Sequence, residues 1–371
     1  MEQHNHQTVQ RIVVKVGASV LTDGAGRVMP ERIERLVDDL AGCASAGGHP
    51  VLVSSGAIAC GMERLGLARR PGALAQLQAC AAIGQSELMH RYTRAFAARR
   101  TLTAQVLLTQ QDLADRARFR NAKQTLLTLL HRRVVPVVNE NDTVSVEEIT
   151  FGDNDRLAAL VAAAVDAHLL VVLSDVDGFL QDGKVLDRVD ALNELRAGGQ
   201  GAKRQVTKGG MGSKLEAARI AGHSGIPMII ANGTRPGALA EILAGRSVGT
   251  LFVPPRERLA SRKWWIAYAL RQPRGTLIVD SGAAEALEAG RSLLATGVRE
   301  VRGRFDAGAF VALADERGGE IARGVSNFSS AELSRIRGLR SAEAARALGA
   351  SRAREVIHRD QLVLAKELRK G

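Results

Sequence analysis

The feature that most constrains the fold is an alternation, over residues 1–255, of short runs rich in Val, Ile and Leu with segments of helical periodicity. Strands that are apolar along their whole length are buried on both faces, as in a parallel sheet covered by helices. The sequence therefore predicts an α/β fold, an open and mostly parallel sheet in an α/β/α sandwich. Strands are expected at Arg11–Val16, Pro50–Val53, Leu102–Leu107, Val134–Val138, His168–Leu173 and Pro227–Ala231. Helices are expected at Pro30–Ala46, Leu74–Ala98, Phe119–His131, Arg156–Val165 and Lys214–His223.

The pattern changes after residue 255. Residues 256–274 carry a net charge of +5 and are predicted to form a basic helical linker, with Trp264 and Trp265 packed between two domains. Residues 275–358 are expected to form a small β-rich domain, and residues 359–371 a charged tail. The strands of the small domain are predicted at Thr276–Asp280, Val298–Arg302, Ala309–Leu313 and Glu320–Gly324.

Composition excludes several classes of protein. Apolar residues make up 46% and charged residues 24% of the chain, which excludes wholesale disorder. The polar start has no secretory signal, and the longest apolar stretch, Leu157–Leu173, is broken by Asp166 and His168. The three cysteines show no disulfide or zinc spacing. We therefore expect a cytoplasmic protein that does not enter a membrane.

Several familiar motifs are absent. The chain has no G-x-x-x-x-G-K-[ST] loop and no G-x-G-x-x-G after its first strand, so P-loop and Rossmann sites are excluded. The tripeptide His358-Arg359-Asp360 occurs in protein kinases, but the other kinase motifs are missing and the match is interpreted as chance.

Two lysines lie where a parallel sheet binds its ligands. Lys15 lies within the first apolar strand, ahead of Gly17, where it is either a surface lysine of an edge strand or a phosphate ligand. Lys214 follows the glycines of K-G-G-M-G-S-K at the start of a helix, a position that suits anions better than cations. A lysine at that position indicates an anionic ligand; the alternative is a flexible glycine hinge.

Further polar segments follow other predicted strands. They are Ser54-Ser55-Gly56-Ala57, Asn139-Glu140-Asn141-Asp142, Gly152-Asp153-Asn154-Asp155 and Ser174-Asp175-Val176-Asp177-Gly178. Helix caps and acidic turns explain some of these residues but not all of them. Lysines, carboxamides and glycine loops together favour phosphoryl transfer, which depends on positioning and positive charge. A carboxylate acceptor would need no general base, because its pKa near ~4 leaves it ionised at neutral pH.

These motifs resemble the amino acid kinase family, and in particular its members that phosphorylate glutamate. The resemblance is carried by V-V-K-V-G-A-S-V-L-T, V-V-P-V-V-N-E-N-D-T, G-D-N-D, L-L-V-V-L-S-D-V-D-G and K-G-G-M-G-S-K. The segments G-T-L-I-V-D-S-G-A-A-E-A-L and I-A-R-G-V-S-N resemble a PUA domain. The resemblance implies ATP-dependent phosphorylation of the L-glutamate side-chain carboxylate to L-glutamyl 5-phosphate, the first step of proline biosynthesis, with ATP used as its Mg²⁺ complex.

The resemblance also implies roles for individual residues. The catalytic residues would be Lys15, Lys214 and Asp155. Glutamate would be bound by Ser55, Asn139, Asp142, Asp153 and Asn154. ATP would be bound by Lys15, Gly17, Ser174, Asp175, Lys208, Gly209, Gly210, Met211, Gly212, Ser213 and Lys214. No metal ligand is expected from the protein, since Mg²⁺ would be bound through ATP. A homo-oligomer, dimer or tetramer, and functional coupling to glutamyl-phosphate reductase are also expected.

Two alternatives stay open from the sequence. Acetylglutamate kinase, aspartokinase and uridylate kinase share the scaffold, although they lack the C-terminal β-rich domain. RNA binding is the alternative of another class, because PUA domains occur in RNA-modifying proteins and residues 256–274 are basic. The PUA-like segment offers few aromatics for stacking on bases, namely Phe305, Phe310 and Phe328.

Overall fold

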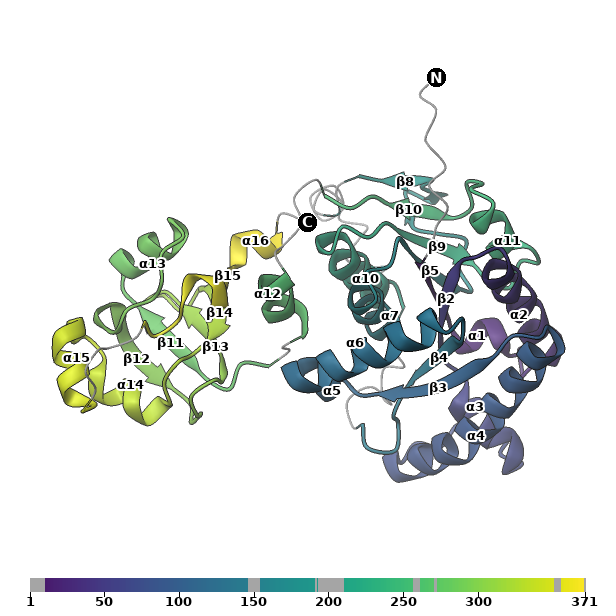
Figure 1. Ribbon diagram of the computed structural model, residues 1–371, viewed down its shortest axis with the longest axis horizontal. Coiled ribbons are helices and arrows are strands. Elements are labelled where there is room, and N and C mark those ends of the chain that lie inside the picture. Colours follow the sequence, from purple (N-terminus) through teal and green to yellow (C-terminus); the bar gives the residue numbers. More distant parts are fainter. Residues whose placement is uncertain are drawn as a thin grey trace, which may run out of the picture. The chain divides into compact units, whose positions relative to one another are not determined.

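The computed structural model describes residues 11–145, 154–190, 192, 210–255, 261–269, 272–349 and 355–369. The chain divides into two compact units, Met1–Arg258 and Leu259–Gly371, which are called the first and second units below (Figure 1).

The first unit is built on an eight-stranded sheet with the order β3-β4-β2-β1-β5-β9-β10-β8. The six strands from β3 to β9 run parallel, whereas β10 pairs antiparallel with β9 at the far side of the sheet. The prediction of an open, mostly parallel sheet is confirmed. The strands are β1 (Arg11–Val16), β2 (His49–Ser54), β3 (Thr103–Leu108), β4 (Val135–Glu140), β5 (Leu169–Ser174), β8 (Arg188–Val189), β9 (Met228–Asn232) and β10 (Thr250–Phe252), with a separate hairpin of β6 (Leu180–Gln181) and β7 (Lys184–Val185).

Helices cover both faces of this sheet (Figure 1). On one face, α1, α2, α3, α4 and α11 share an apolar core with the sheet, and on the other α6, α7 and α10 contact the strands. The described helices are α1 (Ala18–Leu21), α2 (Pro30–Ser45), α3 (Ala57–Arg64), α4 (Leu74–Ala98), α5 (Gln110–Ala114), α6 (Arg116–His131), α7 (Asn154–Ala164), α10 (Met211–His223) and α11 (Ala238–Leu243). This arrangement is the predicted α/β/α sandwich.

Strand alternation explains which side chains reach which face. In β1, Ile12, Val14 and Val16 belong to the core beneath α2 and α4. Because neighbouring residues of a strand point to opposite faces, Lys15 emerges on the face covered by α7 and α10. The same alternation in β4 places Asn139 on the α4 face, with Val135 and Val137.

Two glycines set the separation of α3 and α4. A Cβ atom at Gly84 would lie 1.8 Å from the carbonyl oxygen of Ala57, and one at Gly61 would lie 1.9 Å from that of Cys80. The two helix backbones therefore approach more closely than any side chain at these positions would permit.

The second unit contains a five-stranded sheet with the order β12-β11-β13-β14-β15, in which only the β11–β13 pair is parallel. Residues 359–371 were expected to form a tail, but β15 in this segment pairs with β14, so the sheet continues past residue 358. The elements of this unit are α12 (Ser261–Trp264), η1 (Trp265–Ala269), β11 (Thr276–Val279), α13 (Ser281–Glu288), η2 (Ala295–Gly297), β12 (Val298–Arg302), β13 (Phe310–Ala314), β14 (Glu320–Val325), α14 (Ser330–Ile336), α15 (Ser341–Ala347), η3 (Arg359–Gln361), β15 (Leu362–Leu364) and α16 (Ala365–Arg369).

Residues 256–274 were predicted to form a basic helical linker, but the described part of this segment is not a regular α-helix along its length. The short helix α12 continues into the π-helix η1, which contacts β14 and β15. The consecutive residues Ile266, Ala267 and Tyr268 are all buried, which a helix with a single apolar face would not allow. Among the described residues, no helix is both long enough and apolar enough to span a membrane.

Candidate active site

Two lysines and one aspartate form a buried cluster at the carboxyl edge of the sheet. The Nζ of Lys15 lies 2.5 Å from Oδ1 of Asp155, and the Nζ of Lys214 lies 3.0 Å from Oδ2. The three side chains come from β1, the first turn of α7 and the first turn of α10. Their exposed fractions are only 5%, 2% and 7% for Lys15, Asp155 and Lys214. The predicted catalytic residues therefore lie together, and Lys15 is on a central strand rather than an edge strand.

Further contacts in the first turn of α10 position Lys214. The Oγ of Ser213 lies 2.9 Å from Oδ2 of Asp155 and 3.0 Å from the carbonyl oxygen of Gly210, so its one hydrogen can go to either acceptor. The Nζ of Lys214 also donates to the Gly210 carbonyl, at 3.3 Å. The segment predicted to bind phosphate is thus tied to the carboxylate that pairs the two lysines.

The cluster has an excess of positive charge. Burial by itself would raise the pKa of the Asp155 carboxyl, but the ammonium groups of Lys15 and Lys214 outweigh burial and hold the pKa below its usual value. Asp155 is therefore a carboxylate at neutral pH. One carboxylate between two ammonium groups leaves a net charge of +1, which would favour an anionic ligand.

A second cluster surrounds the side-chain amide of Asn154. Its Nδ2 lies 3.0 Å from the Ser54 carbonyl oxygen, 3.0 Å from Oγ of Ser55 and 2.9 Å from Oδ1 of Asn139. Three of the predicted glutamate-binding residues are therefore joined by hydrogen bonds, although they belong to the ends of β2, β4 and the start of α7.

Sequence reasoning missed two residues that support this cluster from α4. The Oε1 of Gln85 accepts a hydrogen bond from Nδ2 of Asn139 at 2.8 Å. The hydroxyl of Tyr92 lies 2.8 Å from Oγ of Ser54 and is fully buried. Neither residue belongs to a motif at a strand end, so only the packing of α4 against the sheet brings them to the site.

Of the remaining predicted site residues, the structure describes some but not all. Asp142 is half-buried in the turn that follows β4. Ser174 ends β5, and its hydroxyl donates to the carboxylate of the exposed Asp175 at 3.1 Å. Gly17 follows β1, and its amide donates to the Leu173 carbonyl at 3.1 Å. Met211 and Gly212 lie in the first turn of α10, whereas Asp153, Lys208 and Gly209 lie outside the described residues.

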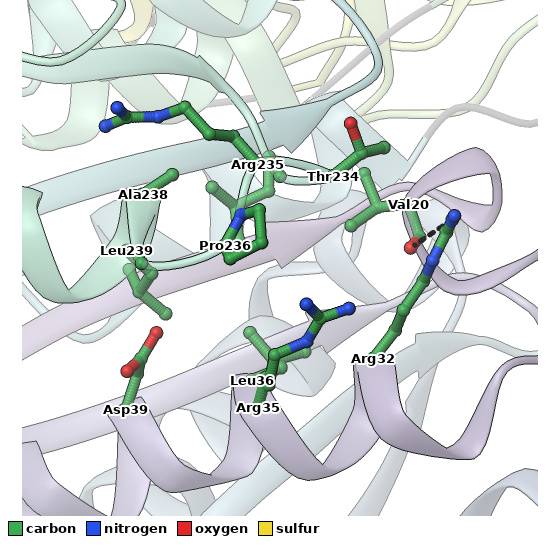
Figure 2. Close-up of a pocket in the computed structure, with 13 residues that line it drawn as sticks. Val20, Arg32, Arg35, Leu36, Asp39, Thr234, Arg235, Pro236, Ala238 and Leu239 are labelled. Carbon is green, nitrogen blue, oxygen red and sulfur yellow. Dashed lines mark hydrogen bonds between the residues drawn. The ribbon is translucent and has the colours of Figure 1, made fainter.

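A recess beside α2 is lined by residues that the sequence analysis did not single out (Figure 2). The guanidinium of Arg32 donates to the carbonyls of Ser19, Val20 and Thr22, and Arg235 is paired with Glu241. Burial raises the pKa of Asp39, which points toward Leu239 in Figure 2. Arginines and a carboxylate therefore share this recess. Arg32 joins α2 to α1, whereas Arg235 makes a local ion pair with α11.

Comparison with a protein-family model covers the residues of these two clusters. The model of the amino acid kinase family matches residues 10–232, which include every described residue of both. The chain belongs to the amino acid kinase family. A second match, to the PUA domain, covers residues 275–348.

Curated relatives of this amino acid kinase match it over almost its whole length. It is 49% identical over 366 residues to glutamate 5-kinase of Salinispora arenicola, and 46% identical over 364 residues to that of Moorella thermoacetica. The first alignment covers 96% of this chain and 98% of the relative, and the second covers 96% of both. Among solved structures, UMP kinase from Bacillus anthracis is similar with a TM-score of 0.47 and 15% identity, over 67% of this chain and 97% of that chain.

The few aromatics of the PUA domain, which the sequence analysis weighed against RNA binding, are buried. Phe305, Phe310 and Phe328 are each less than 10% exposed. They pack in the interior of the second unit, so they cannot form a platform for stacked bases.

Proposed function

We propose that this chain transfers the γ-phosphoryl group of ATP to the side-chain carboxylate of L-glutamate, forming L-glutamyl 5-phosphate. The observation that carries the proposal is the pair of buried lysines held on either side of Asp155. The similarity to glutamate 5-kinases, at 46–49% identity for the two relatives described above, supports glutamate as the acceptor.

The reaction needs charge compensation more than proton transfer. The acceptor carboxylate is ionised at neutral pH, so it can attack without a base. One of its oxygens forms a bond to the γ-phosphorus while the bond from that phosphorus to the β,γ-bridging oxygen breaks, and ADP leaves with the electron pair. The difficulty is that an anion must approach a triphosphate. Lys15 and Lys214 would lower this barrier, since each cation contributes up to ~4 kcal/mol at ~4 Å and an effective dielectric of 20.

Asp155 would position the two cations rather than take part in bond making. Without it, two ammonium groups would repel each other in a site from which water is largely excluded. Because each carboxylate oxygen contacts one lysine, both ammonium groups are held before substrate arrives. Such preorganised charge stabilises a transition state without reorganisation during the reaction.

The two clusters suggest how the substrates are divided. We assign glutamate to Ser55, Asn139, Asp142, Asp153 and Asn154. We assign ATP to Lys15, Gly17, Ser174, Asp175 and the segment from Lys208 to Lys214. Mg²⁺ would enter bound to the phosphates of ATP, where it neutralises charge. Among the residues that the structure describes, no group of three or more His, Cys, Asp or Glu side chains could hold a metal ion.

Formation of L-glutamyl 5-phosphate is the first step of proline biosynthesis from glutamate, so we propose that this chain acts at that step. An acyl phosphate hydrolyses readily, so we expect a reductase that consumes glutamyl 5-phosphate to act with it.

An acyl-phosphate trap tests this proposal. The protein is incubated with ATP, Mg²⁺ and hydroxylamine, and hydroxamate is measured with glutamate, aspartate or N-acetylglutamate as acceptor. We expect hydroxamate with glutamate in clear preference to the other two. Formation with N-acetylglutamate alone would overturn the proposal, because that acceptor lacks the free α-ammonium.

A further inference from the structure

Three side-chain amides form a continuous hydrogen-bonded chain across three elements of the first unit. Nδ2 of Asn154, at the start of α7, donates to Oδ1 of Asn139 on β4 at 2.9 Å. Nδ2 of Asn139 donates in turn to Oε1 of Gln85 on α4 at 2.8 Å. All the donors run in one direction, from α7 toward α4.

Backbone groups determine this direction. The nitrogen and oxygen of a side-chain amide are nearly alike in shape, so their assignment depends on the surrounding partners. The Ser54 carbonyl, 3.0 Å from the Asn154 amide, can only accept, so Nδ2 must face it. The backbone N–H of Glu140, 2.9 Å from the Asn139 amide, can only donate, so Oδ1 must face it. Gln85 must then present Oε1 to Asn139, and its Nε2 faces elsewhere.

The chain also determines which atoms are left for a ligand. Asn139 is 2% exposed; its oxygen accepts from both Asn154 and Glu140, and its nitrogen donates to Gln85. Its nitrogen keeps one N–H, so Asn139 can donate one further hydrogen bond to a ligand. Among the described residues, Nε2 of Gln85 and Oδ1 of Asn154 have no hydrogen-bond partner, and Oγ of Ser55 only accepts. The cluster thus offers ligands the amide nitrogen of Gln85, the second N–H of Asn139, the hydroxyl hydrogen of Ser55 and the amide oxygen of Asn154.

We infer that Gln85 is a further substrate-binding residue, whose Nε2 donates to a carboxylate of the amino acid substrate. The inference rests on the proposed function, because only an amino acid acceptor brings a carboxylate to this cluster. A carboxylate has acceptors alone, which matches an amide nitrogen that has donors alone. The α-ammonium has donors alone and matches Oδ1 of Asn154. The direction of the amide chain thereby selects the orientation in which an amino acid is bound.

The substitution Gln85→Glu tests this inference sharply. It keeps the shape of the side chain and an acceptor oxygen for Asn139, but replaces the Nε2 donor with a carboxylate oxygen. Loss of a hydrogen bond to a charged group predicts a rise in the KM for glutamate of roughly tenfold to a hundredfold. The KM for ATP and the melting temperature should change little. The matched control is Gln76→Glu, which adds the same charge to an exposed position of α4 and should leave both constants unchanged.

The pH dependence of the KM for glutamate provides a second test. It should not change if Gln85 has only a structural role. Protonation of the introduced carboxylate restores a donor. The difference in KM for glutamate between Gln85→Glu and the wild type should therefore decrease as the pH falls. If that variant does not fold, Gln85→Met removes the donor without adding charge and should raise the same constant. An unchanged KM for glutamate, or an equal rise for ATP, would overturn the inference. Failure of the wild-type protein to phosphorylate glutamate would instead overturn the proposed function.

Discussion

The carboxylate of Asp155 lies 2.5 Å from the ammonium of Lys15, and this contact joins the start of α7 to the central strand of the parallel sheet. Its other oxygen contacts Lys214, so one buried side chain determines the positions of both proposed catalytic cations.

Lys214→Ala should lower the turnover number by about 10²–10³-fold, because a preorganised cation is lost from the transition state. The fold should persist, since Asp155 keeps Lys15 as its partner. Steady-state kinetics and a melting curve on one preparation measure both effects. Lys184→Ala, at an exposed position of β7, serves as the control. An unchanged turnover number would exclude Lys214 from the reaction.

Asp155→Asn should destabilise the protein in a pH-dependent way. The folded-state pKa of Asp155 is depressed below the usual value of 3.8, so the carboxylate contributes stability above that value and loses it as the pH falls through the folded pKa. The difference in melting temperature between wild type and variant should therefore be constant from pH 7 to about 5 and shrink only below about 4. A difference that disappears between pH 7 and 5 would show that the carboxyl is not held in its charged form.

Asp142→Ala should raise the KM for glutamate far more than the KM for ATP. The α-ammonium of glutamate needs an acceptor, whereas ATP is anionic at its reacting end. If Asp142 only caps the turn after β4, the variant should instead lose about 0.5–2 kcal/mol of stability, with both constants unchanged. Asp175 is assigned to ATP, so Asp175→Ala should instead raise the KM for ATP more than the KM for glutamate. A selective ATP defect in Asp142→Ala would contradict the assignment of glutamate to this residue.

A chain that ends at residue 258 should keep phosphoryl transfer to glutamate. The two compact units divide there, and every proposed site residue precedes position 215. The cut lies ahead of η1, which contacts β14 and β15 within the second unit. The hydroxamate assay on the purified fragment measures the outcome. A folded fragment without activity would show that the second unit is required by the site.

Gly84→Ala should destabilise the first unit, because the added Cβ would lie 1.8 Å from the Ala57 carbonyl oxygen. Overpacking of this kind costs about 1–3 kcal/mol or more. Gly42→Ala, in the exposed interior of α2 with nothing within 4 Å of the added atom, should stabilise by about 0.5–1 kcal/mol. Denaturant melts of both variants give the two free energies of unfolding. Equal effects would contradict the close approach of α3 and α4.

The sequence determined the strands and the chemistry of the first unit to a large extent. Arg11–Val16 and Leu74–Ala98 are a strand and a helix with the predicted bounds, because the periodicity of apolar residues is a local property of the chain. Shorter elements with weaker periodicity, such as β8, β10 and β15, were missed. They depend on pairing with strands from elsewhere in the chain.

Tertiary structure decided which of the candidate side chains meet. Strand periodicity states that Lys15 points away from Val14, but only the packing of α7 and α10 on that face brings Asp155 and Lys214 to it. Gln85 was missed for the same reason. It lies in a helix without any catalytic motif, and it contacts the site through its hydrogen bond with Asn139. A sequence pattern reports the spacing of residues along one element. A site at the edge of a parallel sheet is built from elements that are distant in sequence, so its contacts depend on how those elements pack.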